Sequence, residues 1–163
     1  MLMVISAVGG SSAGAQKARS PNLQGTWTLD ATKSDPLFRG GKPVANGTLT
    51  LIIEHREPTV NIRRVVGSPS GEQVRLLSYS TDGKENKNPS IRGAEVISTS
   101  SWQQDKLVTK GRQLIDSPLG RVYTELAEVW TLSPDGKTLT IESKTTVPVV
   151  GARTHKEVFV KKG

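Results

Sequence analysis

The chain has 163 residues, no cysteine, two histidines, and 34% hydrophobic and 23% charged residues. This length suits one domain with a real core, while the missing cysteines exclude a disulfide-bonded miniprotein, a cysteine-ligated metal centre and a cysteine nucleophile. The net charge of +7 arises from 22 Lys and Arg against 15 Asp and Glu. Because these basic residues are scattered and no stacking aromatics lie among them, we expect no nucleic-acid binding.

Residues 1–15 differ from the rest of the chain because they carry no charge and combine a short apolar run with small residues. Ala13-Gly14-Ala15 resembles the A-x-A cleavage end of a secretory signal peptide, although the positive start of such a leader is missing. The stretch is therefore either the remnant of a longer leader or a flexible apolar terminus. A leader remnant predicts export to the periplasm or exterior of a bacterium. After it, we expect a flexible terminus at residues 16–22 and one domain at residues 23–163.

From residue 22 onward the sequence predicts strands and almost no helix. Apolar residues alternate with period two in short segments rich in Val, Ile, Thr and Leu, the pattern of half-buried strands. A bulge is predicted at residues 63–65, where the apolar parity changes. The expected strands are residues 25–29, 48–54, a segment around Val60 and Ile62, 73–79, 95–102, 106–114, 121–132, 137–144 and 154–161.

The connections between these strands predict how they pair. Asp82-Gly83 and Asp135-Gly136 are tight-turn dipeptides, and only residues 81–92 form a longer polar connection. Short links join antiparallel neighbours, because a parallel crossover needs a dozen or more residues. We therefore expect an all-β, up-and-down meander of about eight or nine strands that closes into a barrel and so removes its edges. Its interior is either packed or hollow enough for one small ligand.

The first strand resembles the opening of a known family. Leu23-Gln-Gly25-Thr-Trp27-Thr-Leu-Asp30 is similar to the G-x-W motif of lipocalins and the wider calycin superfamily. The resemblance implies a lipocalin-like barrel in which Gly25 and Trp27 close one end and Arg153 covers the tryptophan ring. Later segments, such as Glu128 to Thr140 with its Asp-Gly-Lys turn, resemble small secreted bacterial lipocalin-like proteins of unassigned function. The Thr-Asp-Tyr motif of lipocalins and the helical lid pattern of intracellular fatty-acid carriers are absent.

The sequence contains no recognised catalytic constellation. Gly67-Ser-Pro69-Ser-Gly71 has a proline where a nucleophile elbow needs serine, and phosphate-loop, dinucleotide and zinc-protease motifs are missing. His155 shares a strand face with Glu157, which predicts a hydrogen-bonded surface pair. We therefore expect no enzyme, no metal and no cofactor.

A few polar residues are predicted to face the barrel interior together with tryptophans. Glu128 shares a face with Leu126 and Trp130, so an inward orientation requires a cation or a raised pKa. Arg64, Arg75 or Arg112 could supply that cation; alternatively, Glu128 forms a structural ion pair or points outward. The candidate ligand-binding residues are Ser98, Ser100, Trp102, Glu128 and Trp130.

Three classes of function remain open. The leading hypothesis is an exported barrel that binds a small hydrophobic or amphipathic ligand. The second is an envelope structural or interaction protein with a filled barrel, and the third is an enzyme built on a barrel scaffold.

Overall fold

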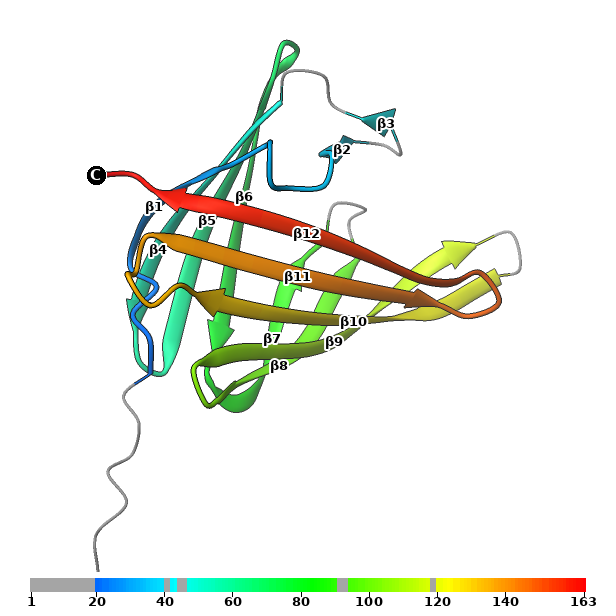
Figure 1. The fold of residues 1–163 in the computed structure, drawn as a ribbon. Helices are drawn as coiled ribbons and strands as arrows, with labels where there is room; N and C mark the ends of the chain where they lie inside the picture. The colour runs from blue at the N-terminus through cyan, green and yellow to red at the C-terminus, as the bar shows by residue number, and fades with distance from the viewer. Residues whose placement is uncertain (1–19, 40–41, 44–46, 91–93, 118–119) are drawn as a thin grey trace, which may run out of the picture.

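The fold is all-β, as expected, and Figure 1 shows the strands wrapping into a nearly closed barrel. The computed structural model describes residues 20–39, 42–43, 47–90, 94–117 and 120–163. The predicted leader at residues 1–15, and most of the predicted flexible terminus, lie outside the described residues. Within the described ranges there is no helix, and hence none that could cross a membrane.

Ten strands form one antiparallel sheet in the order β6-β5-β4-β1-β12-β11-β10-β9-β8-β7. They are β1 (Gly25–Leu29), β4 (Thr48–Arg56), β5 (Thr59–Ser68), β6 (Gly71–Ser80), β7 (Asp82–Pro89), β8 (Glu95–Gln103), β9 (Lys106–Ser117), β10 (Gly120–Leu132), β11 (Thr138–Val147) and β12 (Gly151–Lys161). Between β1 and β4, β2 (Phe38–Arg39) pairs with β3 (Lys42–Pro43) as a separate two-stranded sheet. The chain is thus the predicted meander, with β1 pairing to both β4 and β12.

Because the strands run up and down, their connections gather at two ends of the barrel. We call the end with the β4–β5, β6–β7, β8–β9 and β10–β11 turns the closed end. The opposite end, with the β5–β6, β7–β8, β9–β10 and β11–β12 connections, is the open end.

Two local predictions were wrong. The polar connection expected at residues 81–92 contains β7, which apolar alternation could not reveal because its sequence, DGKENKNP, contains no large apolar residue. The bulge expected at residues 63–65 is absent, since Arg63, Arg64 and Val65 pair in unbroken register with both neighbouring strands. The alternation of apolar residues in the sequence breaks there because Arg64, and not an apolar residue, faces the barrel interior. The register shift lies instead within β7, between Asp82 and Glu85.

The two edges of the sheet, β6 and β7, are joined by asparagine side chains in place of a backbone ladder. The Asn88 carboxamide accepts a hydrogen bond from the Ser78 N–H (2.7 Å) and donates one to the Ser78 carbonyl (2.9 Å). The Asn86 carboxamide accepts from the Ser80 N–H at 2.7 Å. These bonds satisfy edge groups that would otherwise be unpaired, which explains why a strand this polar belongs to the barrel wall.

The hydrophobic core surrounds Trp27, which is fully buried and donates its indole N–H to the Leu23 carbonyl (2.9 Å). Inward side chains from β4, β5, β11 and β12 pack around it. The buried cluster comprises Leu23, Trp27, Leu49, Leu51, Ile53, Val60, Ile62, Tyr79, Leu107, Trp130, Leu139, Ile141 and Phe159.

The G-x-W motif has a clear physical role at the closed end. Gly25 has φ of +138°, and a Cβ at this position would lie 2.8 Å from Cε of Lys161. The glycine therefore leaves room for the Lys161 side chain, whose Nζ lies 5.2 Å from the centre of the Trp27 ring. The assignment of Arg153 to this role was wrong: Arg153 is at the other end of β12, where it lines a cavity near the open end.

We expect Trp27→Ala to lower the free energy of unfolding by about 3 to 5 kcal/mol, because it leaves a large cavity in a core that can relax only partly. Urea denaturation of the two proteins measures this difference. An unchanged midpoint would show that Trp27 does not hold the closed end together.

Candidate functional site

A cavity of about 580 Å³ lies inside the barrel and reaches the open end. Residues of β4 to β12 form its wall, and residues from the β7–β8 and β11–β12 connections lie at its rim. Its inner part is apolar, where it meets the core. The residues that it shares with the core cluster are Leu51, Ile62, Tyr79, Trp130 and Ile141.

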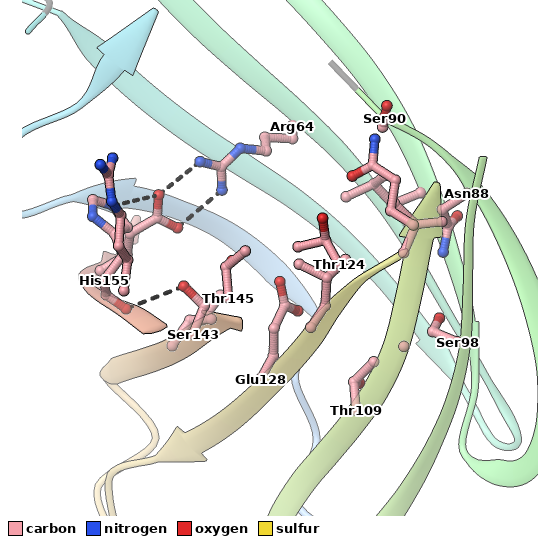
Figure 2. Close-up of a pocket in the computed structure, with 18 of the residues that line it drawn as sticks. Arg64, Asn88, Ser90, Ser98, Thr109, Thr124, Glu128, Ser143, Thr145 and His155 are labelled. Atoms are coloured by element: carbon pink, nitrogen blue, oxygen red, sulfur yellow. Dashed lines mark hydrogen bonds and ion pairs between the residues drawn. The ribbon is translucent and has the colours of Figure 1, made fainter. Parts of the chain in front are cut away.

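Charged groups from four strands face this cavity. Arg64 on β5 reaches across to Glu157 on β12 and makes two hydrogen bonds, of 2.9 and 2.7 Å, to its carboxylate. Figure 2 shows this bidentate pair beside His155, whose Nε2 lies 3.5 Å from Glu157 Oε1. His155 and Glu157 do share a face, as predicted, but the pair lines the cavity and not the outer surface.

The Glu157 carboxyl stays ionised despite its burial. Burial alone would raise its pKa, but hydrogen bonds from Arg64 and His155 outweigh burial and lower the pKa from 4.5 to about 2. The hydrogen bond to Glu157 is also the main reason that the pKa of His155 is raised above its ordinary value. Arg64 and Glu157 thus neutralise each other.

Glu128 on β10 is the second carboxyl in the cavity, and it points into the space, which is the inward one of the orientations considered from the sequence (Figure 2). Its hydrogen-bond partner is the Trp130 indole N–H, at 3.2 Å. Burial raises the pKa of Glu128, and the bond from Trp130 and the positive charge of Arg64 only partly offset this effect. Unlike Glu157, Glu128 has no hydrogen bond from a cation among the described residues.

Two cations of the cavity wall have no hydrogen-bond or ion-pair partner among the described residues: Arg75 on β6 and Arg153 on β12. Burial lowers the pKa of Arg75, and the charge of nearby Arg64 lowers it further. An arginine remains charged under such a shift because its ordinary pKa is so high. With Arg64 and Glu157 balanced, the cavity carries excess positive charge.

Three buried side-chain polar atoms of the described residues lack a hydrogen-bond partner, and all three belong to residues that line this cavity. They are Arg64 Nε, Ser98 Oγ and Thr124 Oγ1. Buried polar atoms are normally satisfied by protein or water. Their concentration in one space shows that the wall can offer hydrogen bonds to whatever fills it.

The structure brings together three of the five predicted ligand-binding residues. Ser98, Glu128 and Trp130 line the cavity. Ser100 faces inward but is fully buried against Thr109 Oγ1, at 2.7 Å.

Trp102 belongs to a separate cluster at the closed end. Its indole N–H donates to Glu57 (2.7 Å), and its ring stacks on His55 with centroids 6.0 Å apart. Glu57 also accepts hydrogen bonds from Thr81 and from His55 Nε2. Neither Ser100 nor Trp102 is part of the cavity wall.

Of the three arginines considered as partners of Glu128, Arg64 and Arg75 face the cavity. Arg112 instead lies over the ring of exposed Tyr123, with its Cζ 5.3 Å from the ring centre. The sequence analysis considered Arg64, Arg153 and Glu157 in other roles, and it did not predict that Arg64 pairs with Glu157 or that Arg153 lines the cavity. Strand parity contained the signal, because Arg64 continues the face of Val60 and Ile62, and Arg153, His155 and Glu157 are spaced by two. Pairing across the barrel could not be read from that spacing.

Comparisons with known proteins identify the fold. No family model matches the chain, and no curated protein matches it by sequence. Among solved structures, Echinococcus granulosus fatty-acid-binding protein 1 is similar, with 16% identity over 86% of this chain and 97% of that chain and a TM-score of 0.57. Zebrafish ileal bile acid-binding protein, complexed with cholic acid, shows 14% identity over 86% and 98% of the two chains, with a TM-score of 0.55.

A third similar structure has a name that states no ligand. It is secretory abundant heat soluble protein 4 from Ramazzottius varieornatus, with 16% identity over 91% of this chain and 100% of that chain and a TM-score of 0.56. At these identities the likeness shows the fold alone: an antiparallel up-and-down β-barrel like those of the three similar structures, and near the lipocalin-like barrel expected from the sequence.

We expect Glu157→Gln to destabilise the protein at pH 7 by about 3 to 5 kcal/mol, because it leaves Arg64 buried and unpaired. The lowered pKa of Glu157 means that its contribution is present above pH 4.5 and is lost as pH falls towards 2. The difference in unfolding free energy between wild type and variant should therefore shrink across that range, as measured by urea denaturation at several pH values.

Glu142→Gln, on the exposed face of β11, is the matched control and should change stability little at any pH. A Glu157→Gln effect that did not vary with pH would contradict the assignment of an ionised Glu157.

Proposed function

We propose that the barrel binds one small amphipathic molecule, with its apolar body against the inner wall and an acidic group at Arg75. The observation that carries this proposal is an interior cavity containing an arginine that no described residue pairs. Arg75 is half-buried, so part of its hydration is lost, and a ligand carboxylate would replace it with a charge-assisted hydrogen bond.

The size and lining of the cavity support an organic ligand. A volume of about 580 Å³ lies within the usual range of roughly 300 to 1,000 Å³ for small-molecule sites, which combine apolar walls with a few oriented polar groups. Here Leu51, Ile62 and Ile141 offer apolar contact, while Trp130 adds an aromatic edge. A fully packed interior, the second hypothesis from the sequence, describes only the part of the barrel around Trp27.

Charge distinguishes the acidic ligand from a neutral or basic one. Among the described residues, half-buried Arg75 and exposed Arg153 have no hydrogen-bond or ion-pair partner. Arg64 neutralises Glu157, and the pKa of Glu128, the other carboxyl among the described lining residues, is raised by burial. Ser98 Oγ can donate a hydrogen bond to the same acidic group, and so can Glu128 in its protonated form, which burial favours. The proposed ligand contacts are therefore Arg75 for charge, Glu128 and Ser98 for hydrogen bonds, and Trp130 for the apolar body.

The similar structures agree with this proposal at the level of the fold. Two of them are named as binding proteins for fatty acid and bile acid, and the second was solved with cholic acid. Both ligands are acids with large apolar bodies. We propose the same chemical class for this chain and no enzymatic activity.

We expect the protein to bind a fluorescent long-chain fatty acid, and Arg75→Met to weaken binding by about 10- to 100-fold, the loss typical of a hydrogen bond to a charged group. Displacement by dodecanoate and by dodecanol, measured by fluorescence, separates charge recognition from apolar contact. Dodecanol has no charge, so it should displace the fluorescent fatty acid equally well from wild type and from Arg75→Met.

Arg63→Met is the matched control. Arg63 is next to Arg64 in the sequence but lies on the outer, exposed face of β5, so this variant should bind with unchanged affinity. Wild-type protein that binds dodecanoate no better than dodecanol would contradict the proposed anion-binding site at Arg75.

We further propose that residues 1–15 direct export to the periplasm or exterior of a bacterium. Expression of the full chain in a Gram-negative host should yield a periplasmic protein that begins at Gln16 by amino-terminal sequencing. Ala13→Asp/Ala15→Asp should block this cleavage. An uncleaved wild-type chain in the cytoplasm would contradict the export proposal.

A further inference from the structure

The turn between β11 and β12 exposes two consecutive valines. Val149 and Val150 are 92% and 70% exposed, the highest values among the exposed large hydrophobic residues of the described chain. Side chains exposed to this degree contribute almost nothing to the folded core. The turn therefore presents apolar surface that the barrel does not need for its own stability.

The backbone conformation makes this choice of residue more informative. Val149 has φ of +69°, in the left-handed region that β-branched residues rarely adopt. Glycine or asparagine would fit the turn with less strain. The fold thus accepts a strained valine whose side chain contacts mostly solvent, which points to a use for that side chain outside the fold.

The part of the hairpin nearest the tip is basic. Residues 143–156 include Lys144, Arg153, His155 and Lys156 and contain no Asp or Glu. Glu142 and Glu157 flank this segment, and exposed Glu142 is the cross-strand neighbour of Lys156. Lys144 and Lys156 are exposed, and Arg153 is exposed at the cavity rim. The hairpin therefore combines an apolar tip with cations further back along both arms, Lys144 on β11 and Arg153 and Lys156 on β12.

The hairpin also forms part of the mouth of the cavity. Val147, Val150, Gly151 and Arg153 line it, and Figure 1 shows the β11–β12 turn projecting on the same side as the β9–β10 hairpin. On β10, Tyr123 adds a further exposed apolar side chain, 55% exposed. A surface that received the tip would therefore lie against the opening of the barrel.

We infer that the β11–β12 tip docks on an anionic lipid surface, inserting Val149 and Val150 between headgroups while Lys144 and Lys156 contact lipid phosphates. An apolar tip flanked by cations is the combination that binds such surfaces, because apolar burial and attraction to anionic lipid add. We choose an anionic lipid surface as the partner because its negative headgroups complement the positive charges of the hairpin. Docking would let an amphipathic ligand pass between bilayer and cavity, but the inference itself depends only on the hairpin.

The test is co-sedimentation of the full chain with vesicles of phosphatidylcholine alone or of phosphatidylcholine and phosphatidylglycerol at about 7:3, without added ligand. We expect binding to the anionic vesicles that weakens as salt rises. Val149→Ser/Val150→Ser should reduce this binding at least about tenfold. Lys144→Gln/Lys156→Gln should reduce it by about fivefold for each lysine.

Leu76→Ser is the matched control, because Leu76 is 68% exposed in the middle of β6, away from the hairpin. It should bind vesicles like wild type. Circular dichroism of every variant establishes that the barrel is folded.

Equal sedimentation of wild type and Val149→Ser/Val150→Ser would overturn the inference, as would equal binding to neutral and anionic vesicles. Wild-type protein that stays in the supernatant with both vesicle types would also overturn it, and would leave the tip as a contact for a protein partner. Fatty-acid binding in solution is measured separately, so a failure to dock with intact ligand binding rejects this inference alone. A protein that docks but binds no fatty acid rejects the proposed ligand alone.

Discussion

The bidentate ion pair between Arg64 and Glu157 joins β5 to β12 across the inside of the barrel and separates two kinds of interior. On its closed-end side, Trp27, Leu139 and Phe159 fill the space with apolar side chains. Beside it, the cavity wall carries hydroxyls, Glu128 and two arginines without a partner among the described residues: Arg75, the cross-strand neighbour of Arg64, and Arg153 towards the open end. Both charges are buried, and replacing such a pair by apolar side chains is often neutral or stabilising. The Arg64–Glu157 pair is therefore better explained by the polarity of the cavity than by a contribution to the stability of the core.

Closure of ten strands explains why a cavity exists at all. A barrel of about eight strands is just filled by its side chains, and its width grows with strand number. Here β6 and β7 meet through Asn86 and Asn88 side chains, so the wall stays continuous without a full backbone ladder. The sheet is wide enough that its open-end half cannot be filled by the Ser, Thr and Gly residues that line much of it. Ten strands and small inward residues together produce the space in which an amphipathic ligand fits.

The sequence predicted the fold well wherever apolar alternation was present. Strands such as residues 48–54 and 121–132 were recovered because burial of one face produces period two, and the meander followed from their short turns. β7 was missed because its wall position depends on carboxamide hydrogen bonds to β6, which leave no apolar signal. The bulge expected at residues 63–65 was wrong for a related reason: an inward arginine broke the apolar pattern while the strand itself continued.

The candidate site was predictable only in part. Glu128 and Trp130 were found inside the cavity because they lie on one predicted face of a strand. Arg153 was assigned to Trp27 through the family resemblance, yet the register of β12 gives that place to Lys161. The Arg64–Glu157 pair joins residues 93 positions apart, so only the closed topology brings the two together. Strand faces can be read from a single sequence, whereas cross-barrel partners cannot.

The most direct test of the account is the ionisation of a bound acid. The carboxyl signal of ¹³C-carboxyl-labelled dodecanoate, followed by NMR as pH is lowered, reports whether the acidic group lies beside unpaired arginine. The account predicts a bound signal whose carboxyl pKa is lower than that of free dodecanoate, and loss of that lowering in Arg75→Met. A bound dodecanoate that titrates as it does in water, or no bound signal at all, would contradict an anion site inside the barrel.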